Sequence, residues 1–464
     1  MNIKNSFEKN GHIVLFCLVS AVIAFSTSLT STVIDTFHEG EYLGFLWHMR
    51  AYYNGIGEFP LLIHGAVDYI PSIIASLIYG DERIIVGTRQ IGSILLWLGW
   101  VLFLDLGHTI IPKSSRKVFW TAALVLVFVA LTPKLGSDYL TMQGAIVGAR
   151  DFFLVVTIWA VARYIDAASK SARFLFLWIA SFAAMTSIFW CYDRGLMAVA
   201  FFGICVLGCF LTKRTVEGWF LVFSSALSLL LIEYSNIFGS ITSNIDNIIY
   251  WIKYGEDLWS YPLKEQLIPY IGGGIMVLFS VVVISIAFLQ KFDRGQERYL
   301  IIGLIVVQLL LLKTTMNRPG GSRTLAAIWP PILLMFHYGA ALFPVSNFDW
   351  RKYLKSNTSI SHYVYFASFA LLFFATTNVQ TLYIVGLKYG SFFKNMIMPH
   401  KDFELVSADM NQLADQLRKS NVSCFVGWTS EGVIALMANK RFCTKYTYAA
   451  YISPKEELNF LTQL

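Results

Sequence analysis

Charged residues are scarce in this sequence, because Asp, Glu, Lys and Arg together make up only 14% of its 464 residues. A soluble protein of this length would carry about a quarter. Hydrophobic residues reach 56%, aromatic residues 16%, and the mean hydropathy is +0.58. The sequence also lacks a Walker loop, a GxGxxG segment and a zinc pattern, which excludes the commonest nucleotide and zinc motifs. The composition indicates an α-helical polytopic membrane protein.

The net charge of +7 does not indicate a nucleic-acid partner, because the basic residues lie in short loops between apolar runs. The first apolar run, 13–34, is too long for a signal-peptide core and has no small-residue cleavage site before the acidic residues that follow. We therefore expect it to be a retained transmembrane helix. Of the six cysteines, Cys424 and Cys443 fall in a polar tail, where they could pair if the tail is extracytoplasmic.

Windows of about twenty apolar residues predict eleven transmembrane helices. They cover residues 12–34, 84–111, 119–134, 152–165, 174–190, 196–212, 219–234, 268–290, 299–313, 324–343 and 362–387. If Lys4 and Lys9 are cytoplasmic, every second loop should be basic. Five short loops satisfy this rule, with Lys113, Arg116 and Lys117; Arg163, Lys170 and Arg173; Lys213 and Arg214; Lys291, Arg294 and Arg298; and Arg351, Lys352 and Lys355. The first long loop, 35–83, and the tail are then extracytoplasmic.

The pattern divides the chain into a transmembrane domain, 1–387, and a small α/β domain, 388–464. In the first outer loop, 39–56 is predicted to be an amphipathic helix lying along the membrane interface. The tail is predicted to contain a helix at Asp402–Lys419, a strand at Cys424–Trp428, a helix at Glu431–Ala438 and a strand at Cys443–Tyr448. Residues 454–464 begin another helical pattern and stop, so we expect this domain to be incomplete.

Ionisable residues gather directly after the first helix, where Asp35, His38, Glu39 and Glu41 fall within seven residues. Charged groups at the membrane boundary are costly and usually functional. A carboxylate at a partly dry interface has a raised pKa and suits a general base. Any one of Asp35, Glu39 and Glu41 could be the base, or His38 could do that work. The alternative is a helix cap at Asp35 followed by solvated charges.

Further candidates lie in loops that the predicted topology brings to the same face. Arg318 and Arg323 flank a Gly-Gly-Ser turn before a helix, an arrangement that favours an anion such as phosphate. Arg150-Asp151 and Asp193-Arg194 begin inward-going helices and could be structural ion pairs or part of the same site. Four residues could line the path of a sugar or acceptor: His64, Asp68, Tyr254 and Trp259. A turn, a helix cap or an interfacial aromatic belt would explain these four equally well.

Taken together, the many spans, the long first outer loop and the Asp35–Glu39 segment resemble the GT-C superfamily of membrane glycosyltransferases. The tail around Cys424–Tyr448 is similar to extracytoplasmic domains of bacterial members. The resemblance implies a polyprenyl-phosphate-sugar donor, with its phosphate held by Arg318, Arg323, Arg150 or Arg194. It implies that Asp35 or Glu39 activates a hydroxyl of an envelope glycan or lipid-linked acceptor such as O-antigen, outside a bacterial inner membrane. It implies no cofactor and no metal ligands, and leaves a divalent metal as an open alternative.

Two other classes fit parts of the pattern. An O-antigen polymerase or ligase is also polytopic with outer-loop arginines, but usually carries its long loop between later spans. A lipid-linked sugar transporter or flippase would place ionisable groups in the middle of helices. Here they collect at one face, which favours the enzyme.

Overall fold

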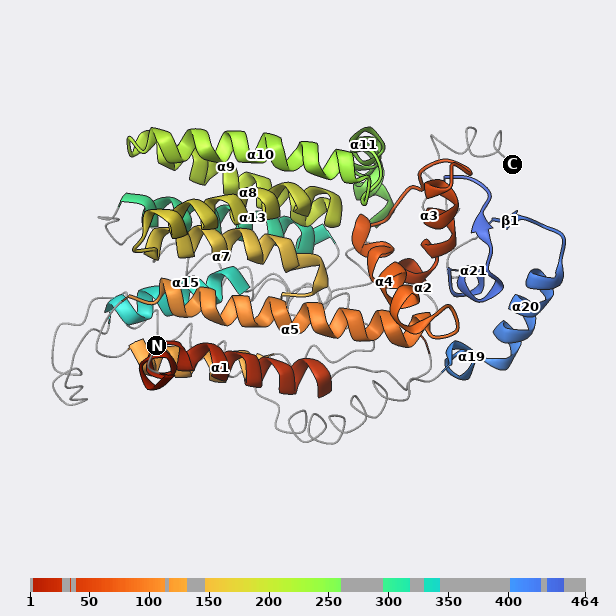
Figure 1. Ribbon diagram of the computed structural model, residues 1–464, viewed down its shortest axis with the longest axis horizontal. Coiled ribbons are helices and arrows are strands. Elements are labelled where there is room, and N and C mark those ends of the chain that lie inside the picture. Colours follow the sequence, from red (N-terminus) through yellow and green to blue (C-terminus); the bar gives the residue numbers. More distant parts are fainter. Residues whose placement is uncertain are drawn as a thin grey trace.

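The computed structural model describes residues 3–26, 34, 39–112, 117–131, 147–259, 295–317, 329–342, 401–426 and 432–445. Its long helices lie side by side in one bundle (Figure 1). They are α1 (Ile3–Ser26), α5 (Ile84–Ile110), α6 (Lys117–Leu131), α7 (Phe152–Asp166), α8 (Lys170–Trp190), α9 (Tyr192–Leu211), α10 (Thr215–Ser235), α13 (Gly295–Asn317) and α15 (Trp329–Leu342). Each coincides with an expected span. The expected spans 268–290 and 362–387 lie outside the described residues.

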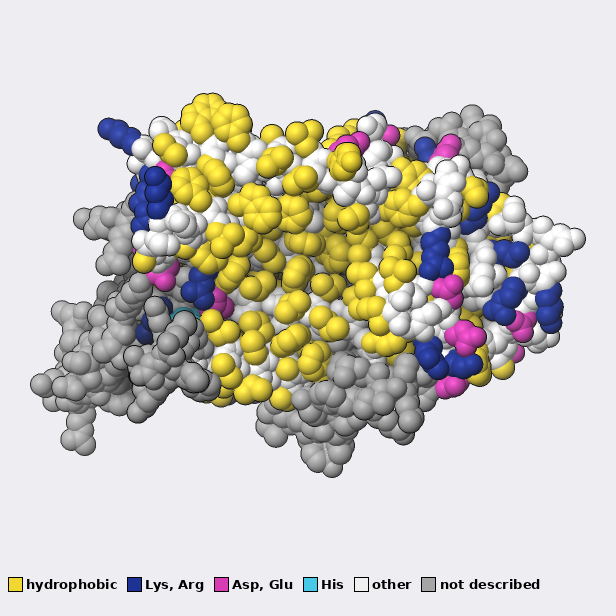
Figure 2. All heavy atoms as spheres, viewed as in Figure 1, with side chains coloured by type: hydrophobic (Ala, Val, Ile, Leu, Met, Phe, Trp, Pro, Cys, Tyr) yellow, Lys and Arg dark blue, Asp and Glu magenta, His cyan; other side chains and the backbone are white. Residues whose placement is uncertain are grey.

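The surface of the bundle has the distribution that a bilayer requires. Hydrophobic side chains cover the middle of the face in Figure 2, while Lys, Arg, Asp and Glu gather toward its two ends. Large apolar side chains such as Leu126, Phe223 and Leu230 point outward and are more than 60% exposed. Such exposure would be costly in water and is favourable in lipid. Within the described ranges, α5, α8, α9 and α10 are long and apolar enough to cross a membrane. The protein is an integral membrane protein.

One end of the bundle is fastened by a buried carboxylate near the C-terminal end of α5. Asp105 accepts hydrogen bonds from Trp159 Nε1 at 2.6 Å and from Arg163 Nε at 2.8 Å, both on α7. His12 on α1 lies 3.6 Å from the same carboxylate and stacks on His108, with ring centroids 4.2 Å apart. A charge buried at a helix end is tolerated because it is paired and hydrogen-bonded. The cluster therefore joins α1, α5 and α7.

The first outer loop differs from the predicted interfacial helix. Segment 39–56 forms two short helices, α2 (Gly40–Leu43) and α3 (Leu46–Tyr53), separated by a turn. The expected amphipathic helix has five apolar side chains at helical spacing, and Tyr53 among them is 38% exposed. The other four are buried inside the protein: Tyr42, Phe45, Leu46 and Met49. They pack against the 59–69 segment, the start of α5 and the C-terminal domain, which together cover the apolar face in place of lipid. The loop continues through η1 (Ala66–Asp68) and α4 (Ile70–Tyr79).

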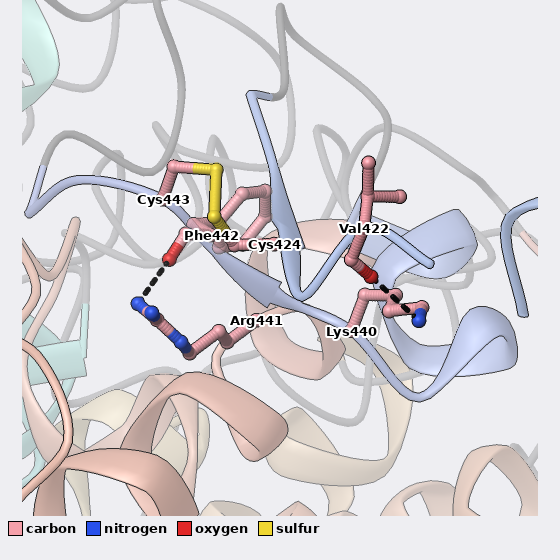
Figure 3. The surroundings of a disulfide bond; sticks show 6 residues. All are labelled: Val422, Cys424, Lys440, Arg441, Phe442 and Cys443. Atoms are coloured by element: carbon pink, nitrogen blue, oxygen red, sulfur yellow. Dashed lines mark hydrogen bonds between the residues drawn. A yellow bond between two sulfur atoms is a disulfide. The ribbon is translucent and has the colours of Figure 1, made fainter. Parts of the chain in front are cut away.

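The described part of the tail contains α19 (Asp402–Leu405), α20 (Ala408–Lys419), β1 (Cys424–Phe425), α21 (Gly432–Ala438) and β2 (Arg441–Phe442). The predicted single helix 402–419 is interrupted because Ser407 adopts an extended backbone and caps α20, accepting from Met410 N. The second strand begins at Arg441 rather than Cys443, and pairs in parallel with β1. Cys424 and Cys443 form a disulfide with their Cα atoms 4.9 Å apart (Figure 3).

The tail is fastened to the first outer loop and to the start of α5. The carboxylate of Asp402 accepts from the backbone N–H groups of Ile84 and Ile85, each at 2.9 Å, and so caps α5. Trp47 on α3 donates its Nε1–H to the carbonyl oxygen of Leu436 on α21 at 3.0 Å. Leu61 N donates to Lys445 O at 2.7 Å. The tail therefore supports the loop from the side opposite the bundle.

The contact between α3 and β2 is expected to weaken in acid. His48 is buried beside Phe442, with one ring nitrogen 2.9 Å from the carbonyl oxygen of Glu58. Burial lowers the pKa of His48 to about 4. Because the unfolded chain titrates near 6.5, the stabilisation is complete above that pH. It falls by up to about 1.4 kcal/mol per pH unit as the pH drops from about 6.5 to about 4.

The measurement is thermal unfolding of the wild type and His48→Gln between pH 4.5 and 7.5. The stability of the wild type should decline more steeply with acid than that of the variant. Burial raises the pKa of Asp402 to about 7. The contribution of Asp402 to stability therefore changes with pH in the opposite direction to that of His48. Its contribution is the same in both proteins and cancels in the difference. Parallel curves would show that His48 does not sense pH at this contact.

Candidate active site

The carboxylate of Glu39 forms an ion pair with Arg89, which lies inside one of the predicted transmembrane helices. Arg89 lies on α5, one and a half turns from its N-terminus, and is buried. Its Nε and Nη2 donate to the two carboxylate oxygens of Glu39 at 2.6 and 2.8 Å. A bidentate pair of this kind fixes the orientation of the carboxylate, which suits Glu39 to a positioning role. Asp35 and His38 lie outside the described residues.

Two more residues of the first outer loop, Glu41 and Tyr42, belong to the site. Glu41 and Tyr42 belong to α2 and are buried. The charge of Arg150 and the carboxylates of Glu41 and Asp68 all act on the Tyr42 phenol. Burial is the largest effect, and it raises the pKa of Tyr42 well above its usual value of 10. The phenol is therefore neutral and can donate a hydrogen bond.

Arg150 and Arg194 are joined to acidic residues across two helix starts. Arg150, in η3 (Ala149–Asp151), donates to Asp193 Oδ2 at 3.1 Å. Arg194, in the first turn of α9, donates to Asp151 Oδ1 at 2.6 Å and to Asp193 Oδ2 at 2.9 Å. The sequence suggests pairing within each adjacent Arg-Asp couple, whereas two of these three ion pairs join η3 to α9. Two guanidinium groups facing two carboxylates leave little net charge for a phosphate.

Cys191 sits between these charges at the junction of α8 and α9. Its thiol donates to Asp193 Oδ1 at 3.0 Å and accepts from Arg150 Nε at 3.4 Å. Burial raises the pKa of the Cys191 thiol, so it is protonated and serves as a hydrogen-bonding spacer.

His64 and Asp68 form a second acid–base pair at the same place. The His64 ring nitrogen Nδ1 lies 2.8 Å from Asp68 Oδ1, and His64 N donates to Asp68 Oδ2 at 2.7 Å. Tyr192 N donates to the carbonyl oxygen of His64 at 2.7 Å. Gly65 allows this close approach, because its φ is +129° and a Cβ there would lie 2.7 Å from Phe189 O. The loop is therefore pressed against the α8–α9 junction.

The remaining aromatic candidates lie on α11 (Ile241–Trp259), which is seen end-on at the outer end of α10 in Figure 1. Trp251 donates its Nε1–H to Leu62 O at 2.7 Å, and the Tyr254 ring contacts Tyr250 at a centroid distance of 5.0 Å. This helix supports the loop that carries His64. The side chain of Trp259, and Arg318 and Arg323 as a whole, lie outside the described residues.

The structure thus brings together Glu39, Glu41, His64, Asp68, Arg150 and Arg194 at one end of the bundle. Sequence reasoning missed Arg89 and Tyr42 as members of this group. An arginine inside an apolar run was itself a signal for Arg89, because charge at that depth requires a partner. Nothing in the local sequence distinguishes Tyr42 from a lipid-facing aromatic residue. Among the described residues, no three His, Cys, Asp or Glu side chains are placed to hold a metal ion.

No protein-family model matches the chain, and no curated protein matches it in sequence. Two crystal structures of ArnT from Cupriavidus metallidurans are similar in fold. The one bound to undecaprenyl phosphate has 12% identity and a TM-score of 0.46, over 97% of this chain and 87% of ArnT. The apo structure has 12% identity and a TM-score of 0.45, over 94% and 86%. ArnT is a GT-C glycosyltransferase. Such distant likenesses carry no residue assignment, which has to come from the site itself.

Proposed function

We propose that this protein is a GT-C-type membrane glycosyltransferase. It transfers a sugar from a polyprenyl-phosphate donor to a hydroxyl of an envelope glycan or lipid-linked acceptor. The reaction takes place at the outer face of a bacterial inner membrane. The observation that carries the proposal is the meeting of buried acids, an imidazole and guanidinium groups from the first outer loop, η3 and α9 at one end of an apolar bundle.

Such a group of residues suits transfer from a lipid phosphate for physical reasons. The apolar bundle lets the polyprenyl chain lie in the bilayer beside the site, while the reacting sugar stays at the polar end. Guanidinium groups near the leaving phosphate stabilise its developing charge. We assign this role first to Arg318 and Arg323, because the pairing of Arg150 and Arg194 with acids suits those two to holding the site together.

A group of the first outer loop takes the proton of the attacking hydroxyl. Asp35 is the carboxylate candidate, and Arg89 holds the carboxylate of Glu39 four positions later in the chain. General-base help of this kind contributes about 100- to 10,000-fold to the rate.

The test is transfer from undecaprenyl-phosphate-linked sugars in proteoliposomes, following the glycosylated acceptor and the released lipid phosphate. If a carboxylate of this segment is the base, alanine at one of Asp35, Glu39 and Glu41 abolishes transfer while the protein still inserts. Full activity in all three variants would eliminate a carboxylate base. Flux of the intact lipid-linked sugar without transfer would instead identify a transporter.

A further inference from the structure

We propose that the imidazole of His64, oriented by Asp68, takes the proton from the attacking hydroxyl. We further propose that the Tyr42 phenol holds a second oxygen of the same carbohydrate. This inference rests on the proposed glycosyl transfer and assigns the base to an imidazole in place of Asp35. It begins from two neighbouring side chains of the described site. Asp68 orients His64, and Tyr42 stacks on the His64 ring and has a hydroxyl with no hydrogen-bond partner among the described residues.

The tautomer of His64 follows from its partner. Asp68 is fully buried and accepts from His64 twice, once from the backbone N–H and once from Nδ1. An ionised carboxylate can only accept, so Nδ1 carries the proton and Nε2 presents its lone pair. Among the described residues Nε2 has no hydrogen-bond partner. An imidazole held in this tautomer by a buried aspartate is the arrangement that serves as a general base in hydrolases.

The position of the ring is fixed independently of Asp68. The backbone of His64 is held by Tyr192 N on one side and by the approach of Gly65 to Phe189 O on the other. The Tyr42 ring stacks on the imidazole at a centroid distance of 5.4 Å and an interplanar angle of 6°. Preorganisation of this kind would be unnecessary for a histidine that only fills space, and it lowers the cost of placing a base against a hydroxyl.

Tyr42 supplies the second, independent observation. Its hydroxyl is buried and has no hydrogen-bond partner among the described residues. An unsatisfied buried hydroxyl is costly, and a native protein retains one where a ligand satisfies it. The stacked rings therefore offer one acceptor, Nε2, and one donor, the phenol. Neighbouring hydroxyls of a sugar carry the complementary donor and acceptor.

The proposed step balances in atoms and charge. The acceptor oxygen forms a bond to the anomeric carbon as its proton moves to Nε2 of His64. The bond from the anomeric carbon to the phosphate oxygen breaks, and its electron pair leaves with the polyprenyl phosphate, which gains one negative charge. His64 becomes an imidazolium beside the Asp68 carboxylate and later releases its proton to water.

The groups facing the stacked rings come from every element packed around them. They are Glu41 on α2, Asp68 on η1, Arg150 on η3, and Cys191 and Asp193 at the start of α9.

The experiment compares purified full-length variants in proteoliposomes with the undecaprenyl-phosphate sugar that the wild type uses. His64→Gln should lower kcat about 100- to 10,000-fold and leave the Kd for undecaprenyl phosphate within about twofold. Asp68→Asn should also lower kcat, and should shift the rising limb of its pH profile because the tautomer is no longer fixed. His337→Gln is the matched control, since His337 is a buried histidine bonded to Ile110 O at the other end of α5.

Tyr42→Phe separates a binding role from a structural one. It removes an unsatisfied hydroxyl and keeps the stacked ring, so the unfolding temperature should stay equal or rise. The value of kcat/KM should nevertheless fall about 3- to 10-fold, as expected for one lost hydrogen bond. An unchanged kcat/KM would overturn the role of Tyr42.

The failure of this inference is distinct from failure of the proposed function. If the wild type transfers sugar and His64→Gln retains kcat within about threefold, the imidazole is not the base. The proposed glycosyltransferase function would be unaffected by that result. Loss of activity in Asp35→Ala together with a fully active His64→Gln would assign the base to Asp35. If the wild type transfers no sugar from any polyprenyl-phosphate donor, the proposed function fails and this inference fails with it.

Discussion

Arg89→Met is expected to destabilise the protein by about 3–5 kcal/mol and to abolish transfer. The variant leaves the Glu39 carboxylate, only 12% exposed, without the bidentate partner that holds it. A buried charge that loses its partner keeps its desolvation cost, which is why breaking such a pair costs more than the pair contributes. Detergent-solubilised unfolding and the transfer assay measure the two effects.

The double variant Glu39→Gln/Arg89→Met tests the physical reason. Because it removes both charges, it should recover a large part of the lost stability relative to Arg89→Met alone. Arg50→Met is the matched control, since Arg50 pairs with Asp81 at a partly exposed site where a salt bridge is worth about 0–1 kcal/mol. Equal losses of stability in Arg89→Met and Arg50→Met would contradict the role given to Glu39.

Asp193→Asn should be the second most damaging substitution. Asp193 bridges Arg150 and Arg194, and accepts from the Cys191 thiol. Asparagine has the same shape, so the variant removes charge with little change in packing. Arg150, 21% exposed, and Arg194, 10% exposed, would then lose the carboxylate that they share, and the expected loss of stability is about 1–3 kcal/mol. Thermal unfolding in the same detergent measures it.

Asp246→Asn provides the comparison for this charge removal, because Asp246 is exposed on α11. Its effect should stay within about 0.5 kcal/mol. Adding Arg150→Met to Asp193→Asn restores the balance of charge, and should recover part of the stability. A stable Asp193→Asn protein would mean that water or lipid headgroups reach the arginines and replace the lost carboxylate.

The helices of the bundle were predictable because a span is a local property of about twenty residues. The start of α5 at Ile84 and of α7 at Phe152 agree with the apolar pattern to the residue. The structure of the first outer loop was harder to predict, because a local apolar pattern does not show what covers it. A stripe such as Tyr42, Phe45 and Met49 has helical spacing whether it faces lipid or another part of the protein.

The sequence allowed us to predict which residues gather at one end of the bundle. It did not allow us to predict which acidic side chain forms an ion pair with which basic one. Asp193 beside Arg194 and Arg150 beside Asp151 indicate ion pairing in the sequence. Which acid meets which base depends on the packing of α7 against α9, which has no local signal. The same holds for Glu39 and Arg89, which lie fifty positions apart. Asp402 as the cap of α5 was beyond reach, since its partners lie more than 300 residues earlier.

That cap has a consequence for how the molecule is made. Ile84 leaves the ribosome 318 residues before the carboxylate that satisfies its amide, so the start of α5 must wait while the intervening helices are inserted. During this interval the loop carrying Glu39 has its contacts with the bundle but not yet those with the C-terminal tail. A nascent chain that stalled before Asp402 would have its first helices in the bilayer and still lack one of the contacts that hold this loop. Late closure of this kind would delay the final structure of the loop until the α19–β2 segment had been synthesised.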